Sequence, residues 1–125
     1  MAEQGIIITT SGKMRLGQFE DPFYKTVGKA VGGYIEIVHP QNLKAPYCMV
    51  VDEEGLLKSK TPNSFGCYLY GTMWHGCPIV GDIVILKDGY RNGEPDIVGL
   101  DDVDIASVAK LALRCGITWD EKVEE

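Results

Sequence analysis

The chain has 125 residues, a hydrophobic content of 45% and a formal net charge of -6, from 12 basic and 18 acidic side chains. This composition excludes a disordered chain, which would hold fewer apolar residues, and broad binding to nucleic-acid phosphates, which needs clustered Lys and Arg. No apolar run approaches the roughly 20 residues of a membrane span. The whole acidic excess falls in residues 61–125, where eleven acids accompany five bases.

The first elements are read from a β-branched run and a helix start. The run at residues 5–10 predicts a strand buried on both faces and therefore central in a sheet. Residues 13–20 show no clear period and are expected to form a loop. Asp21 and Pro22 are typical of a helix start, and Gly32 supplies the left-handed residue that ends the helix.

The remaining elements follow from short apolar runs and their punctuation. Pro62 and Asn63 favour a short helix over residues 65–70, although the aromatic spacing there also fits a strand. Asp101 or Asp102 is expected to cap a last helix that stops at Gly116. Further strands are predicted at residues 34–38, 47–51, 79–86 and 97–98.

The order β-α-β-β-α-β-α predicts an α+β fold with a mainly antiparallel four-stranded sheet and helices on one face. Its first six elements match the ferredoxin-like arrangement. A more irregular α+β sheet is the alternative, because the second helix is weak. We expect a single domain over residues 1–119 and an acidic tail over residues 120–125. The start of the chain lacks signal-peptide features, which predicts a cytoplasmic protein.

A Trp-His-Gly-Cys cluster raises the question of thiol or metal chemistry. His75 and Cys77 would share one face of an extended strand, and Cys67 and His39 could complete a zinc site. However, no orienting acid lies nearby, and the four cysteines, which include Cys48 and Cys115, lack paired metal-ligand spacing. We therefore expect reduced thiols, no catalytic residue, no metal and no cofactor.

Residues 61–81 contain no Asp, Glu, Lys or Arg, but they hold four of the eleven aromatic residues: Phe65, Tyr68, Tyr70 and Trp74. Such a segment is either part of the core or an apolar surface for a partner, another subunit or a planar ligand. Both interpretations stay open at this point. Gly32 and Gly33 have two interpretations as well, a helix end or a place where a ligand reaches the backbone.

Four stretches resemble a small, uncharacterised family of domains of unknown function from phages, plasmids and gut-bacterial mobile elements. They are the Val-Gly-Gly-Tyr-Ile-Glu junction at residues 31–36, the acidic turn at 52–55, and residues 61–63 and 79–83. The resemblance covers residues 5–105, with Thr61 in place of the usual apolar residue. It carries no established activity. It implies a mobile-element origin, and small proteins of that origin often act on host pathways, defence systems included.

The resulting hypothesis is a non-enzymatic protein that binds a host small molecule, such as a nucleotide signal, or a host protein, and counteracts host defence in the host cytoplasm. A homo-oligomer is compatible with it. One alternative is an acidic DNA mimic acting through residues 82–125, and another is a small thiol-dependent hydrolase using Cys77 and His75. The predicted binding residues are the aromatic Tyr34, Tyr68, Tyr70 and Trp74, with the polar Asn63, His75 and Arg91 for orientation.

Overall fold

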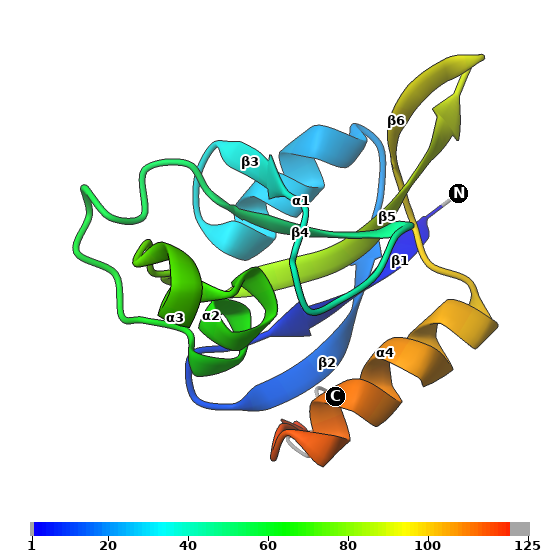
Figure 1. Ribbon diagram of the computed structural model, residues 1–125. Coiled ribbons are helices and arrows are strands. Elements are labelled where there is room, and N and C mark those ends of the chain that lie inside the picture. The colour runs from blue at the N-terminus through cyan, green and yellow to red at the C-terminus, as the bar shows by residue number, and fades with distance from the viewer. Residues whose placement is uncertain (1, 121–125) are drawn as a thin grey trace.

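Seven strands form one sheet in the computed structural model, which describes residues 2–120 (Figure 1). In chain order the strands are β1 (Glu3–Ile8), β2 (Lys13–Phe19), β3 (Ile35–Val38), β4 (Tyr47–Asp52), β5 (Ile83–Arg91), β6 (Glu94–Val98) and β7 (Thr118–Trp119). Their order in the sheet is β3-β4-β5-β1-β2-β7, with β6 pairing to β5. Within the described residues, β2 and β7 pair in parallel, and the other pairs are antiparallel.

Helices cover both faces of this sheet (Figure 1). Helix α1 (Phe23–Val31) packs on one face, in a cluster that includes Ile7 of β1. Helices α2 (Ser64–Tyr70) and α4 (Asp102–Arg114) pack on the other face, in a cluster that includes the neighbouring Ile6 and Ile8. The single-turn helix α3 (Thr72–His75) follows α2 directly. The alternation along β1 separates two hydrophobic layers.

The predicted four-stranded sheet with helices on one face is wrong, and with it the ferredoxin-like arrangement. The structure is an α+β fold whose seven-stranded sheet has helices on both faces. The prediction for residues 5–10 already pointed this way, because a strand that is apolar on both faces needs cover on both. That strand is β1, which lies between β5 and β2 in the sheet.

Strand β2 occupies residues that were expected to form a loop. Its buried positions are Met14, Gly17 and Phe19, whereas Leu16 is 45% exposed, so alternation of apolar and polar residues is blurred. A Cβ at Gly17 would lie 2.7 Å from the Phe19 ring and 2.9 Å from Ile7. The glycine therefore leaves space for that ring, and it removes the apolar side chain by which the strand could have been recognised.

Most helix ends follow the predicted signals. Gly32 has φ 89° at the end of α1, and Asn63 caps α2 by accepting a hydrogen bond from the Gly66 N–H. Asp101 caps α4 and forms a reciprocal capping box with Asp104. The expected cap at Asp21 is wrong, because the N-cap of α1 is Pro22 and no side chain caps it.

Strand β5 begins and ends later than predicted. Gly81 has φ 81°, and this turn separates an isolated bridge at Val80 from the strand that starts at Ile83. At the other end, Gly89 lies within β5, where a Cβ would come 2.7 Å from Val98 of β6. The close approach of β6 therefore explains the glycine in the part of β5 that extends beyond the predicted end at residue 86.

Apart from Asp120, the predicted acidic tail at residues 120–125 lies outside the described residues. Between residues 2 and 120, none of the helices combines the length and the apolar character required to cross a bilayer.

Candidate functional site

A surface groove of about 550 Å³ lies where α1 meets the start of β3. Its volume falls in the range of small-molecule sites, roughly 300–1,000 Å³. The groove combines aromatic rings, ammonium groups and bare backbone. Its lining residues are Tyr24, Lys25, Gly28, Lys29, Gly32, Gly33, Tyr34 and Ile35.

The glycines of the groove are required by the end of α1. The Gly28 carbonyl accepts hydrogen bonds from the N–H groups of Gly32, at 2.8 Å, and Gly33, at 3.0 Å. The left-handed conformation of Gly32 favours glycine. A Cβ at Gly28 would lie 2.8 Å from the Gly33 carbonyl oxygen. The interpretation as a helix end is therefore confirmed, and the same glycines leave backbone uncovered in the groove.

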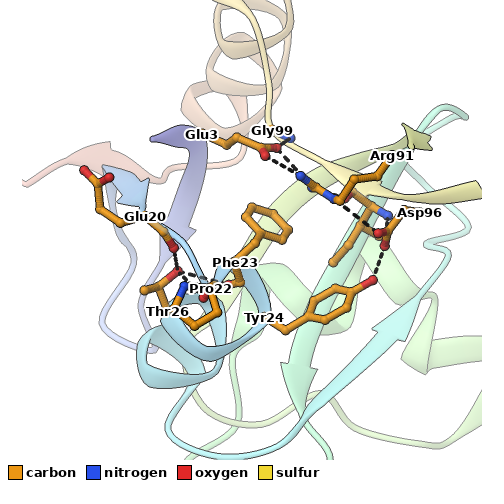
Figure 2. A network of polar contacts seen from close by, with 10 residues as sticks. Glu3, Glu20, Pro22, Phe23, Tyr24, Thr26, Arg91, Asp96 and Gly99 are labelled. Carbon is orange, nitrogen blue, oxygen red and sulfur yellow. Dashed lines mark hydrogen bonds and ion pairs between the residues drawn. The ribbon is translucent and has the colours of Figure 1, made fainter. Parts of the chain in front are cut away.

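Two tyrosines border the groove, and one of them is fixed by β6. Tyr34 is 74% exposed, whereas Tyr24 is half exposed and donates its hydroxyl hydrogen to Asp96. Arg91 Nε donates to the same carboxylate at 3.2 Å (Figure 2). The hydrogen bond to Asp96 raises the pKa of Tyr24, so its hydroxyl stays protonated at neutral pH. Tyr24 therefore presents a ring of defined orientation.

Arg91, a predicted binding residue, lies at the centre of this network (Figure 2). Its guanidinium donates to Glu3 at 2.6 Å and to the Ile97 carbonyl at 2.8 Å, besides Asp96. It also lies 4.6 Å from the centre of the Phe23 ring, a cation–π distance. These contacts join β1, β5, β6 and α1. Arg91 is connected to the groove through Asp96, which also binds the hydroxyl of the lining residue Tyr24.

Lys25 and Lys29 concentrate positive charge beside the tyrosines. They are exposed, lie one turn apart on α1 and make no ion pair within residues 2–120. Like charges at this spacing cost a helix about 0.2–0.5 kcal/mol. Lys25 is also in the first turn, where the helix dipole disfavours a cation. This arrangement, in a chain of net charge -6, suits an anion.

A buried acid supports the end of α1 from below. The Asp52 carboxylate lies 2.8 Å from Lys58 Nζ and 2.6 Å from Lys60 Nζ. The same lysines donate to the last carbonyls of the helix, Lys58 to Gly32 and Lys60 to Val31. Burial raises the pKa of Asp52, but the hydrogen bonds from both lysines outweigh it and lower the pKa to about 2. The acidic turn at residues 52–55 thus begins with a structural carboxylate.

The uncharged segment at residues 61–81 is divided between core and surface. Phe65 and Leu69 are buried under the sheet, as are Ile79 and Val80. On the outside, Tyr68 is 49% exposed and Trp74 is 75% exposed. These two line a cavity of about 360 Å³ together with Asn42, Cys67, Gly71, Thr72 and Met73. The core interpretation is therefore confirmed for part of the segment, and the binding role of the exposed part stays a prediction.

The other predicted binding residues are distributed over different environments. The Asn63 side chain is 1% exposed and hydrogen-bonds the backbone of β1, α2 and the turn at Gly81. Tyr70 is half-buried and lines a small cavity of about 90 Å³ with Cys77. His75 ends α3. The structure thus brings Tyr68 and Trp74 together, but Tyr34 lies in the separate groove beside α1.

The four cysteines are free thiols: Cys48 is buried, Cys67 half-buried, and Cys77 and Cys115 are exposed. Burial raises the pKa of Cys48 to about 12, which keeps it protonated. Within the described part of the chain, no three His, Cys, Asp or Glu side chains are grouped as metal ligands would be.

Several acids of the second half have partners within the fold. Asp96 pairs with Arg91, and Asp104 pairs with Lys87 at 2.5 Å. Asp104 also accepts from the Asp101 N–H in the capping box. These acids thus serve the β5–β6 hairpin and the start of α4, while the DNA-mimic alternative stays a prediction.

Three groove residues were missed by sequence reasoning: Tyr24, Lys25 and Lys29. The core-facing side of the helix holds Phe23 and Val27, and both are buried. The signal for the site is on the other face of the helix, which carries Tyr24, Lys25 and Lys29 and no acidic residue. Only the position of Tyr34, beyond the helix end, brings this face into a groove.

Comparison with known proteins identifies the domain. A family model described as a domain of unknown function, DUF3846, matches residues 3–112. No curated protein and no solved structure matched the chain. The resemblance to an uncharacterised domain family is thereby confirmed, while the phage or plasmid origin stays a prediction. Because the match spans most of its length, the chain belongs to the DUF3846 family.

Proposed function

We propose that this protein is a binding protein without enzymatic activity, and that the groove beside α1 takes a small molecule with a planar ring and a negative charge. The observation that carries the proposal is the pairing of two accessible tyrosine rings with two unpaired lysines. The rings would stack on the planar part of the ligand. Lys25 and Lys29 would bind its anionic group.

The electrostatics of α1 support a charged ligand over a neutral one. Lys25 and Lys29 repel each other, and Lys25 opposes the helix dipole. An anion bound between the two lysines would reduce their mutual repulsion and the unfavourable interaction of Lys25 with the helix dipole. The uncovered backbone at Gly32 and Gly33 would let the ligand come close to the main chain.

For the biological setting, we propose a phage or mobile-element protein that withdraws a host small molecule, such as a nucleotide signal, and so counteracts host defence. The support for this setting is the sequence resemblance described above. Sequestration needs affinity and no chemistry, which agrees with a site made of rings, ammonium groups and backbone.

Anilinonaphthalene sulfonate, an anion with a planar naphthalene ring system whose fluorescence rises in apolar sites, provides a direct test. We expect Tyr34→Ala to weaken its binding about tenfold, because stacking on an aromatic ring contributes about 1–3 kcal/mol. Lys29→Gln should weaken binding about threefold and flatten its dependence on salt. The measurement is a fluorescence titration at low and high salt.

Matched controls are Tyr90→Ala, which removes an equally exposed ring from β5, and Lys110→Gln on α4. Both should bind the dye as the unmodified protein does. Equal affinities for Tyr34→Ala and Tyr90→Ala would count decisively against the groove.

A second candidate function is docking of a host protein on the surface formed by α2 and α3. The observation that favours it is the exposure of Met73, at 89%, and Trp74, at 75%, in a segment without charges. The centres of protein interfaces are depleted of charge and enriched in Trp, Tyr and Met. Such a patch would be covered in a complex.

We expect Trp74→Ala to reduce capture of a host protein at least tenfold, because large aromatic residues dominate interface energetics. The measurement is quantitative mass spectrometry of host proteins retained by immobilised protein. Leu57→Ala is the control, since Leu57 is 85% exposed but lies in the turn after β4. Equal recovery of every retained protein with both variants would exclude this surface.

A further inference from the structure

A second cavity adjoins the groove at Gly32. It has a volume of about 420 Å³, and Gly32 belongs to the lining of both cavities. Gly32 has φ 89° and no side chain, and a Cβ there would lie 2.8 Å from Lys60 Nζ, which belongs to the lining of the second cavity. Because the two cavities share this glycine, a single ligand that occupied both would pass over it.

The second cavity differs in chemistry from the groove. It is lined by the hydroxyl-bearing Thr10, Ser59 and Thr61, together with Lys60 and Asp82. The Thr10 N–H donates to Asp82 Oδ1 at 3.1 Å and so orients the carboxylate. The carboxylate can accept a hydrogen bond from an alcohol, and each of the three hydroxyls can donate or accept one.

This set of groups suits a sugar better than a phosphate. Asp82 would repel a phosphate. Lys60 is already committed, since it donates to Val31 O at 2.7 Å and pairs with Asp52 at 2.6 Å. The unpaired lysines that a phosphate needs are Lys25 and Lys29, on the groove side.

We propose that the ligand is a nucleotide. Its base lies against Tyr24 and Tyr34, its phosphate meets Lys25 and Lys29, and its ribose hydroxyls bind Thr61, Ser59 and Asp82. This inference rests on the proposed function of the groove and adds the second cavity as the sugar site. It predicts that ring, sugar and phosphate all contribute to affinity.

The test is displacement of anilinonaphthalene sulfonate by AMP, GMP, CMP and UMP, with phenyl phosphate and ribose phosphate as fragments. At least one nucleotide should displace the dye at a concentration about tenfold below that of either fragment. Thr61→Val, which keeps the shape of the side chain, should weaken that nucleotide about fivefold and leave phenyl phosphate unchanged. Ser59→Ala provides a second variant, and Thr118→Val on β7, at the opposite edge of the sheet from β3, is the control.

The outcomes separate the two proposals. If Tyr34→Ala leaves dye binding unchanged, the proposed ligand site in the groove is overturned, and the nucleotide proposal with it. Dye binding that depends on Tyr34, combined with nucleotides no better than phenyl phosphate, overturns only the nucleotide. A nucleotide preference that survives both Thr61→Val and Ser59→Ala overturns the sugar site.

Discussion

Asn63→Ala is expected to lower the free energy of unfolding by about 3–5 kcal/mol, the largest effect of any single change proposed for this protein. The Asn63 amide donates to the Ile8 carbonyl at 3.0 Å and to the Gly81 carbonyl at 2.9 Å. Its oxygen accepts from the Gly66 N–H at 2.9 Å. Alanine would remove the hydrogen bonds to two buried carbonyls and one buried N–H, each at a cost of about 1–3 kcal/mol.

The loss matters because a domain of this kind has a total stability of only about 5–15 kcal/mol. Urea unfolding, followed by circular dichroism, measures the difference. Asn42→Ala is the matched control, since the exposed Asn42 makes a single side-chain hydrogen bond, to the Tyr68 carbonyl at 2.7 Å. It should cost less than about 1 kcal/mol. Similar losses in the free energy of unfolding for the two variants would show that the buried hydrogen bonds of Asn63 do not contribute more than one exposed hydrogen bond.

Asp52→Asn is expected to cost about 2–3 kcal/mol at neutral pH and to weaken the dependence of stability on acid. The pKa of Asp52 falls from 3.8 to about 2 on folding, which corresponds to about 2–3 kcal/mol. Because the folded state has the lower pKa, this stability is present above pH 4 and is lost as the pH falls toward 2. The variant carries no titrating group at this position.

The measurement is the free energy of unfolding in urea, taken stepwise between pH 6 and pH 2. The protein should lose stability across this range through Asp52 and also Asp104, whose pKa is lowered to about 2, burial being outweighed by the hydrogen bond from Lys87. In Asp52→Asn, the contribution of Asp52 to this pH dependence should be absent and that of Asp104 should remain. Asp88→Asn is the control, because Asp88 is exposed and, among the residues that the structure describes, forms an ion pair only with His39. An unchanged pH profile in Asp52→Asn would refute the role of the buried pair.

Asn63 and Asp52 show how much of a residue's structural role can be predicted from its sequence neighbours. Asn63 before a helix is a recognisable cap, and the structure confirms it in that role. Its two other hydrogen bonds reach Ile8, 55 positions away, and Gly81, 18 positions away. No local pattern announces bonds over such separations. For the same reason, Asp52 reads as part of a solvated turn until Lys58 and Lys60 are seen to enclose it.

The site shows the same division. The left-handed glycine and the exposed tyrosine at residues 32–34 were visible in the sequence as a place where a ligand could approach. The lysines and Tyr24 were also visible, as residues off the core stripe of α1. Their meeting depends on the close approach of α1 to the Gly33 backbone, which Gly28 permits. That approach is a tertiary contact.

The sequence by itself determined the α+β class, the central buried strand and the main helix ends, because these depend on neighbouring residues: β-branched runs, caps and left-handed glycines. It did not determine the number of strands or the faces that the helices cover. Strand β2 is held by pairing with β1 and by the Phe19 ring over Gly17, and β7 is held by pairing with β2. Only the tertiary structure decides such elements, because their stability comes from partners distant in the chain. It also decided that the uncharged segment is divided between core and surface, and that Lys25 and Lys29 lie in one groove with two tyrosines.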